Sequence, residues 1–446
     1  MSLQAMMHCR TVLLAAVSVA ALSAQKLSTP ELAKLIETKS PQLATALAAS
    51  FPEDALKRGL ASSRGAVTLW AIRSAGKPSI MIEGAPGPAL QQAEGSDLWY
   101  ATNKLNEGMS HRYLFMVDGK PHGQARDVAV YTADSFLKPG VTAGTLTEPL
   151  IHTSKIYDGM KTTYRVYTPA GYSSSTPAAL MVWQDGHAAV NRESESFRVL
   201  DAIDNLTHEK KVPVIVYIFV SPGKIGEAQD GETYKFVKAY SDRSRRQLDD
   251  AMRSVEYDTV SDRYARFLRD ELIPEVAAKY NIRKDAYSHA IAGHSSGAIA
   301  AFNVAWQQPE LFSRVLSWNG TYTAIQPEPN FGGQAFPAMV RSEPKRNMRV
   351  WLQGSVEDNE SRAGSWPLQN IAMANSLKLR EYDFHFTYGT GGHNMVQGSA
   401  EFPESFIWIW RGYDPAKTEE TFTIEPTEKA KPLFRVNVIN RDHGPK

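Results

Sequence analysis

The sequence predicts a protein of the α/β class, in which a mixed α/β domain follows a small β-sandwich. From about residue 161 onward, short apolar runs alternate with helical stretches, and this alternation is typical of a mostly parallel sheet with helices on both faces. Between residues 62 and 135, short apolar runs follow one another with only turn signals between them, which indicates a small sandwich.

These changes in sequence pattern divide the chain into five segments. Residues 25–60 have the apolar periodicity of helices. Residues 136–155 form a linker or a return strand after the sandwich, and the charged, proline-punctuated end of the chain predicts an arm on the surface. The predicted segments are 1–24 (signal peptide), 25–60 (helical), 62–155 (sandwich with linker), 156–413 (α/β domain) and 414–446 (tail).

The first 24 residues have the features of a secretory signal peptide. Arg10 supplies the positive charge, residues 12–22 the apolar stretch, and Ala21-Leu22-Ser23 a small-x-small cleavage site. The stretch is too short for a permanent transmembrane helix, and no other segment is apolar enough to cross a membrane. We therefore expect a secreted protein, periplasmic or extracellular, without a membrane span.

The composition excludes some partners and one kind of nucleophile. The formal net charge is +1, so the chain lacks the basic excess that nucleic-acid binding needs. Hydrophobic residues make up 43% and charged residues 22%, which predicts a large buried core. The single cysteine, Cys9, lies in the predicted signal peptide, so the mature chain has neither a disulfide nor a thiol nucleophile.

Periodicity places the individual elements. In the helix predicted at 260–280, Tyr264, Phe267, Leu268 and Leu272 form one apolar stripe. Strands are predicted in the sandwich at 67–72, 79–82, 98–101 and 113–117, and in the α/β domain at 163–167, 178–183, 212–220, 288–292, 315–318, 349–352 and 384–388. Further helices are predicted at 296–308, 367–379 and 402–411.

The pentapeptide Gly293-His294-Ser295-Ser296-Gly297 has the form G-x-S-x-G and lies between a predicted strand and a predicted helix. In that setting the two glycines permit a strained turn and a close approach of strand and helix, which together present the serine hydroxyl at the top of a sheet. Ser295 is therefore the candidate nucleophile. Taken without its flanks, the pentapeptide could also be a plain surface turn.

A hydrolase with this turn needs an acid and then a histidine, in that order, after the serine. His393 ends the glycine-rich run Tyr388-Gly389-Thr390-Gly391-Gly392 that follows a predicted strand. An imidazole with an ordinary pKa near 6.5 suits general-base work at neutral pH. His393 is the candidate base, and the alternative is a histidine exposed in a loop.

The candidate acid lies in the loop after the strand predicted at 349–352. The acid must accept a hydrogen bond from Nδ1 of the histidine, because this bond fixes the tautomer and stabilises the imidazolium. Asp358 is the first candidate, Glu357 is the alternative acid, and Glu360 comes third. The acidic loop could also be a solvated surface feature.

Two backbone N–H groups are needed to hold an oxyanion. One candidate donor is Ser296, which directly follows the nucleophile. The other lies after the strand predicted at 178–183, where Gly186 and His187 are the candidates, since a glycine lets the backbone approach the substrate oxygen. The Asp185-Gly186 pair could also be an ordinary turn.

Several of these segments carry a family resemblance, which covers about residues 160–413. They include Tyr164-Arg165-Val166-Tyr167-Thr168-Pro169, Trp183-Gln184-Asp185-Gly186, Arg253-Ser254-Val255-Glu256-Tyr257-Asp258, the Ser295 pentapeptide, Gly364-Ser365-Trp366-Pro367-Leu368-Gln369-Asn370 and Gly391-Gly392-His393. Through them the chain resembles the esterases typified by enterochelin esterase and the feruloyl esterases. The N-terminal sandwich resembles the immunoglobulin-like domain, related to starch-binding modules, that often precedes such catalytic domains.

The resemblance implies an α/β-hydrolase fold with Ser295 as nucleophile and His393 as base. It also implies that Arg253, Glu256 and Trp366 line the substrate site, with Trp366 near the acid loop. As alternatives, Glu256 could pair with Arg253 in a structural role, and Trp366 could be a core residue. The charged residues 224–250 look like an insertion and are a candidate lid over the pocket.

The sequence thus predicts a secreted serine carboxylesterase that needs no metal and no organic cofactor. Its expected partner is a small-molecule or oligosaccharide ester: a feruloyl or other aryl ester, a siderophore-type ester, or an acylated carbohydrate. Two alternatives stay open. One is a catalytically inactive, hydrolase-fold protein that binds carbohydrate, and the other is an acyltransferase that uses a sugar acceptor.

Overall fold

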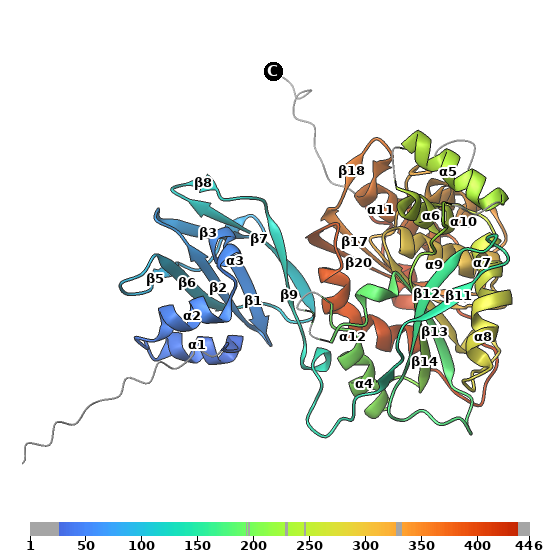
Figure 1. Cartoon of the computed structure of the whole chain (residues 1–446), viewed down its shortest axis with the longest axis horizontal. Helices are drawn as coiled ribbons and strands as arrows, with labels where there is room; N and C mark the ends of the chain where they lie inside the picture. The colour runs from blue at the N-terminus through green and yellow to red at the C-terminus, as the bar shows by residue number, and fades with distance from the viewer. Residues whose placement is uncertain are drawn as a thin grey trace, which may run out of the picture.

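The computed structural model describes residues 26–192, 194, 197–227, 231–244, 247–326 and 332–435, so the predicted signal peptide lies outside the described residues. A small lobe rich in strands lies beside a larger lobe built around a central sheet (Figure 1). No helix within the described ranges is both long enough and apolar enough to span a bilayer.

The small lobe consists of two antiparallel sheets and three short helices. The sheets have the strand orders β1-β2-β6-β5 and β4-β3-β7-β8, with β9 paired to β7. The helix α1 begins at a capping box in which Ser28 and Glu31 satisfy the first backbone N–H groups. The elements are α1 (Thr29–Glu37), α2 (Leu43–Ser50), α3 (Glu53–Arg58), β1 (Leu60–Arg64), β2 (Val67–Arg73), β3 (Pro78–Ile82), β4 (Ala85–Pro86), β5 (Gln91–Gln92), β6 (Leu98–Lys104), β7 (Met109–Val117), β8 (Lys120–Pro121) and β9 (Arg126–Val130).

Successive side chains of β2 point to opposite faces of the strand and enter two different hydrophobic cores of this lobe. Leu69 and Ala71 pack with the helices, whereas Trp70 and Ile72 point to the opposite face and pack against the second sheet. Trp70 is fully buried, and its ring lies 5.2 Å from that of Tyr113 in an edge-to-face contact. These aromatic side chains therefore hold the two sheets together and are not available as a ligand platform.

The large lobe is organised by a nine-stranded sheet of order β10-β12-β14-β13-β15-β16-β17-β20, with β11 also paired to β12. The pairs from β14 to β20 are all parallel, and β12 runs antiparallel to β14. This sheet confirms the predicted α/β class. The strands are β10 (Thr145–Leu146), β11 (Leu150–Thr153), β12 (Lys161–Thr168), β13 (Ala179–Gln184), β14 (Ile215–Val220), β15 (His289–His294), β16 (Arg314–Trp318), β17 (Arg349–Glu357) and β20 (Asp383–Gly392).

The prediction grouped residues 136–155 with the sandwich, and here the structure differs. Both β10 and β11 pair with β12 of the large sheet. The edge of β12 carries backbone groups that need hydrogen-bond partners, and Leu146 and Leu150 also pack against the cores of the large lobe. The stretch from 145 to 153 therefore belongs structurally to the large lobe.

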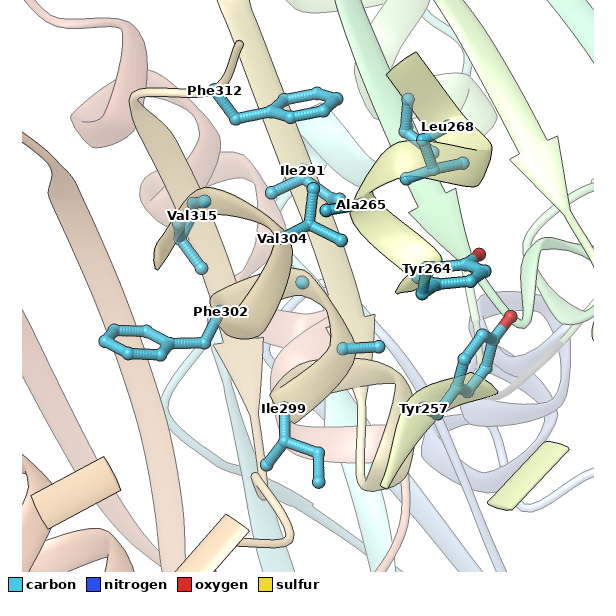
Figure 2. Packing of buried hydrophobic residues seen from close by; sticks show 14 of the residues in the cluster. Tyr257, Tyr264, Ala265, Leu268, Ile291, Ile299, Phe302, Val304, Phe312 and Val315 are labelled. Atoms are coloured by element: carbon cyan, nitrogen blue, oxygen red, sulfur yellow. The ribbon is translucent and has the colours of Figure 1, made fainter. Parts of the chain in front are cut away.

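Helices cover both faces of the large sheet. Along β13, Leu180 and Val182 face one hydrophobic core, and Met181 and Trp183 face the other. Figure 2 shows the first core, in which Phe302 and other side chains of α9 pack against the sheet. The helices are α4 (Leu200–His208), α5 (Glu232–Ser244), α6 (Leu248–Tyr257), α7 (Arg263–Phe267), α8 (Ile273–Ala277), α9 (Ser296–Gln307), α10 (Phe336–Ser342), α11 (Trp366–Leu379), α12 (Val396–Trp410) and α13 (Pro426–Ala430).

The predicted insertion at 224–250 contains α5. Val237 of this helix is fully buried in the first core, and Tyr240 is nearly so. Helix α5 also packs on α6. In the described conformation this helix is therefore an integral layer of the large lobe.

A buried carboxyl group lies where α12 meets β20. Glu401 accepts hydrogen bonds from the hydroxyl of Thr387 at 2.7 Å and from Nε2 of Gln397 at 2.8 Å. Burial raises the pKa of Glu401 from 4.5 to about 7, because the charged form loses water that these two bonds replace only in part.

This raised pKa predicts a pH-dependent contribution to stability. Between pH 4.5 and about 7 the native state holds a proton that the unfolded chain releases, so stability falls as the pH rises through that range, by up to about 3 kcal/mol. The variant Glu401→Gln removes this dependence. Its thermal midpoint relative to wild type should therefore be higher at pH 8 than at pH 5, as measured by calorimetry.

A matched control is Glu310→Gln, which changes an exposed carboxylate on the same lobe. Its midpoint relative to wild type should be the same at both pH values. An equal offset for Glu401→Gln at pH 5 and pH 8 would contradict the assigned shift.

Candidate active site

The G-x-S-x-G pentapeptide forms a sharp turn between β15 and α9. Ser295 has φ 59° and ψ −124°, a backbone conformation that is strained for any residue with a side chain. A Cβ built at Gly293 would lie only 2.2 Å from the carbonyl oxygen of Gly297. Glycine is thus required at position 293, and the turn holds the hydroxyl of Ser295 out beyond the end of the strand.

His393 directly follows β20 and faces Ser295. Its Nε2 lies 2.8 Å from Oγ of Ser295, although the two residues are 98 positions apart. Both side chains are only partly buried, so the pair is open to solvent and to a substrate. An imidazole nitrogen at this distance can accept the hydroxyl proton.

Asp358 directly follows β17 and completes a line of hydrogen-bonded side chains that runs from Ser295 through His393. Its Oδ1 lies 2.5 Å from Nδ1 of His393, and its side chain is fully buried. The two other candidate acids do not reach the imidazole: Glu357 is exposed, and the exposed Glu360 accepts a hydrogen bond from Ser365. Among the three candidates, only Asp358 can hold the tautomer in which Nε2 is free to accept a proton.

The topology of the sheet explains why these residues meet. The strands β15, β16, β17 and β20 are successive neighbours and run parallel. Their carboxyl ends therefore share one edge, where loops of α/β sheets commonly form ligand sites. Ser295, Asp358 and His393 each lie immediately after one of these strands.

Thr321 is a member of the site that the sequence analysis did not single out. Its Oγ1 lies 3.2 Å from Oγ of Ser295 and accepts a hydrogen bond from Nε1 of Trp366, also at 3.2 Å. Thr321 follows β16, so its position after a strand end was the signal in the sequence that could have found it. The hydroxyl gives Ser295 a second polar neighbour beside His393.

Trp366 is a core residue that also contacts the site. Only 5% of the residue is exposed, so it is mainly a core side chain. Its ring nevertheless makes an edge-to-face contact with the imidazole of His393, at 5.9 Å between ring centres. The tryptophan therefore supports both Thr321 and the histidine.

The predicted oxyanion donors lie on adjacent elements. Ser296 is the first residue of α9, where its N–H has no carbonyl a full turn earlier in the helix. The loop after β13 begins at Asp185, with φ 54°, and continues through Gly186 and His187. Since β13 and β15 are paired strands, this loop and the sharp turn at Ser295, called the elbow below, lie at the same edge of the sheet.

Close packing requires glycine in this loop. A Cβ at Gly186 would lie 2.5 Å from Cα of Phe219, and a Cβ at Gly297 would lie 3.1 Å from Oδ2 of Asp185. The loop is therefore pressed between β14 and the elbow. This contact brings Asp185, at the start of the loop, beside the turn that carries Ser295.

Arg253 supports the loop from α6. Its Nε and one terminal nitrogen donate to the two carboxylate oxygens of Asp185, at 3.0 and 2.5 Å. A bidentate pair of this kind is geometrically specific. The guanidinium is one-third exposed, so Arg253 both fixes the loop and remains accessible beside it.

Glu256 differs from its predicted role in substrate binding. The residue is 1% exposed, and its Oε2 accepts a hydrogen bond from the backbone N–H of Gly223 at 2.7 Å. Burial raises its pKa to about 8. Helix α6 turns this side chain into the interior, away from the predicted contact with substrate. Its carboxylate bonds the backbone of Gly223, while the guanidinium of Arg253 bonds Asp185.

A second histidine lies beside His393. The ring centre of His294 is 5.0 Å from that of His393, and burial, with a further effect from His393, lowers the pKa of His294 to about 3. His294 is therefore neutral at physiological pH and adds no charge to the site.

Within the described part of the chain, no three His, Cys, Asp or Glu side chains gather as they would around a metal ion.

Comparison with known proteins identifies the family. The model of the family described as "Putative esterase" matches residues 155–409. A related protein, the iron(III) enterobactin esterase of Dickeya dadantii (strain 3937), is 23% identical over 153 residues, which are 33% of this chain and 35% of that protein. The alignment thus spans about a third of that relative's length.

Solved structures share the architecture. The enterobactin esterase of Shigella flexneri in the presence of 2,3-dihydroxy-N-benzoyl-serine has a TM-score of 0.51 at 15% identity, covering 79% of this chain and 96% of that one. The same enzyme in the presence of 2,3-dihydroxy-N-benzoyl-glycine gives 0.50 at 16% identity, covering 77% and 93%. A ferulic acid esterase from Anaeromyces mucronatus gives 0.44 at 16% identity, covering 64% and 97%.

These findings agree with the fold. At such low identity the two Shigella flexneri structures show a shared fold alone. The family match carries more, because residues 155–409 are more than half of the 446-residue chain. The chain belongs to this esterase family.

Proposed function

We propose that this esterase is a secreted serine carboxylesterase that forms an acyl-enzyme on Ser295. The observation that carries the proposal is the continuous hydrogen-bonded line from Oγ of Ser295 through His393 to Asp358, with distances of 2.8 and 2.5 Å. Secretion is supported by the charged and apolar pattern of residues 1–24.

The first half-reaction transfers the acyl group to the enzyme. As Oγ of Ser295 bonds to the carbonyl carbon of the ester, its proton passes to Nε2 of His393. The tetrahedral intermediate then breaks its bond to the alcohol oxygen, which takes the proton from Nε2. Asp358 stabilises the imidazolium between these two proton transfers and stays ionised throughout.

The second half-reaction returns the enzyme to its starting state. Water gives a proton to Nε2 of His393 and attacks the acyl carbon. Oγ of Ser295 leaves with that proton, and a carboxylic acid is released. In both halves the negative oxygen is held by backbone N–H groups from Ser296 and from the loop at Gly186 and His187.

The proposed substrate class is a siderophore-type ester or another aryl ester, with acylated carbohydrates as the next candidates. Support comes from the enterobactin esterase to which the chain is similar in sequence. A screen of kcat/KM over enterobactin, methyl ferulate and acetylated sugars decides among them. Release of acyl-polyol products when a polyol is added would instead indicate acyl transfer.

We expect Ser295→Ala to lower the hydrolysis of p-nitrophenyl acetate by about 10³-fold or more, because the nucleophile is gone. The wild-type protein should also be labelled by a fluorophosphonate probe, and the variant should not be. Ser175→Ala, an exposed serine in a loop distant in sequence, serves as the control. A variant at position 295 that turns over at the wild-type rate would refute the mechanism, and an unlabelled wild type would favour the inactive binding protein.

Two isosteric variants test the acid. Asp358→Asn should lower kcat by on the order of 10³–10⁴-fold, because the amide favours the wrong imidazole tautomer. Glu357→Gln should stay within about twofold of wild type, since surface changes away from the chemistry have small effects. Kinetics on the same ester measure both, and the reverse ranking of the two variants would overturn the assignment of Asp358.

A further inference from the structure

The peptide that precedes His393 is held from both lobes of the molecule. The N–H of Gly392 donates to Oδ2 of Asp127 at 2.9 Å, and the carbonyl oxygen of Gly392 accepts a hydrogen bond from Nδ2 of Asn319 at 3.2 Å. Asp127 belongs to β9 of the sandwich and lies 265 residues earlier in the chain. Asn319 follows β16 of the large sheet.

The residue after His393 is held by the same carboxylate oxygen. Nδ2 of Asn394 donates to Oδ2 of Asp127 at 2.5 Å. Oδ1 of Asn394 in turn accepts from the N–H of Val396, the first residue of α12, at 2.9 Å. One oxygen atom of the sandwich therefore bridges the two residues that flank the histidine.

Arg112 fixes the orientation of this carboxylate. The guanidinium, on β7 of the sandwich, donates to Oδ1 of Asp127 at 3.1 Å, which leaves Oδ2 for the loop. The side chain of Asp127 is 1% exposed and that of Arg112 is 24% exposed. Burying a carboxylate this deeply is costly unless it is paired and hydrogen-bonded, as Asp127 is here.

The end of β20 that leads into His393 is rich in glycine. Gly389, Gly391 and Gly392 weaken this strand end, which pairs with β17 at Ser355 and Glu357. A Cβ at Gly392 would lie 3.1 Å from Arg112, and one at Gly391 would lie 3.5 Å from Asp127. The glycines thus allow the loop to approach the sandwich closely, and the contacts with the sandwich then restrict it.

We propose that Asp127, oriented by Arg112, is a positioning residue that aims the imidazole of His393 at Ser295. This inference rests on the proposed function, in which His393 is the base. Proton transfer depends on a short, aligned contact, and a displacement of the base of about 1 Å can cost on the order of 10²-fold in rate. The sandwich is then a structural part of the catalytic machinery, although none of its residues touches the reacting atoms.

The test compares variants of the full-length mature protein. Asp127→Ala should lower kcat by about 10- to 100-fold with little change in KM, because binding survives while the base is poorly aimed. Asp127→Asn keeps an oxygen acceptor for the loop and should restore most of that loss. Tyr131→Phe is the matched control, because it removes a different bond between the lobes, from Tyr131 to Ser399 at 3.2 Å, and it should leave kcat within about twofold of wild type.

A double-mutant cycle keeps the test informative if Asp127→Ala also weakens docking of the lobes. Asn394→Ala removes one of the two bonds that the residues flanking His393 make to Asp127, together with the bond to Val396, and leaves the pair of Arg112 and Asp127 intact. The losses of Asp127→Ala and Asn394→Ala should combine to clearly less than their product, because both remove the bond between Asn394 and Asp127. Losses that multiply fully, or a wild-type kcat for Asp127→Ala, would overturn the proposal.

Amide hydrogen exchange separates this inference from the proposed function. Peptides covering residues 389–396 should exchange faster in Asp127→Ala than in Tyr131→Phe, whatever the activity. If Ser295→Ala stays active, the proposed function fails while the exchange result still decides whether Asp127 orders the loop. If Ser295→Ala is inactive and the loop exchanges alike in both variants, only the positioning role fails.

Discussion

The parallel register of the central sheet is the constraint on which the site depends. Because β13, β15, β16, β17 and β20 all run in one direction, their last residues share one edge. Each following loop contributes one component: the loop at Gly186, the elbow, Thr321, Asp358 and His393. The cores on the two faces of the sheet keep this edge rigid, so groups from distant parts of the chain meet at hydrogen-bond distance.

The strained turn at Ser295 is stabilised by its surroundings. A backbone of this kind costs about 1–3 kcal/mol. The N–H of Ser295 donates to the carbonyl of Trp318 at 2.9 Å, and the N–H of Thr321 donates to the carbonyl of Ser295 at 3.3 Å. These bonds tie the turn to β16, and the nearly complete burial of α9 holds the helix in place. Strain is therefore concentrated at Ser295, the proposed nucleophile.

The features that could be predicted from the sequence are those that depend on residues close together in the chain. The glycines around Ser295, the order of Ser, acid and His, and the strand ends before Asp358 and His393 are short-range signals, and they identified the residues that form the hydrogen-bonded line. The burial of Glu256 and the pairing of β10 and β11 with β12 depend on packing between distant segments. Asp127 and Thr321 carry no motif, and their places become visible only when the lobes and loops are assembled.

The contact between Asp127 and the loop of His393 bears on how the molecule matures. Asp127 lies 265 residues before Gly392 in the chain, so their contact can close only when nearly the whole chain is available. The loop gains its final bonds only when the two lobes dock. Under the proposed mechanism, competence for catalysis therefore arises only after both lobes have folded and docked.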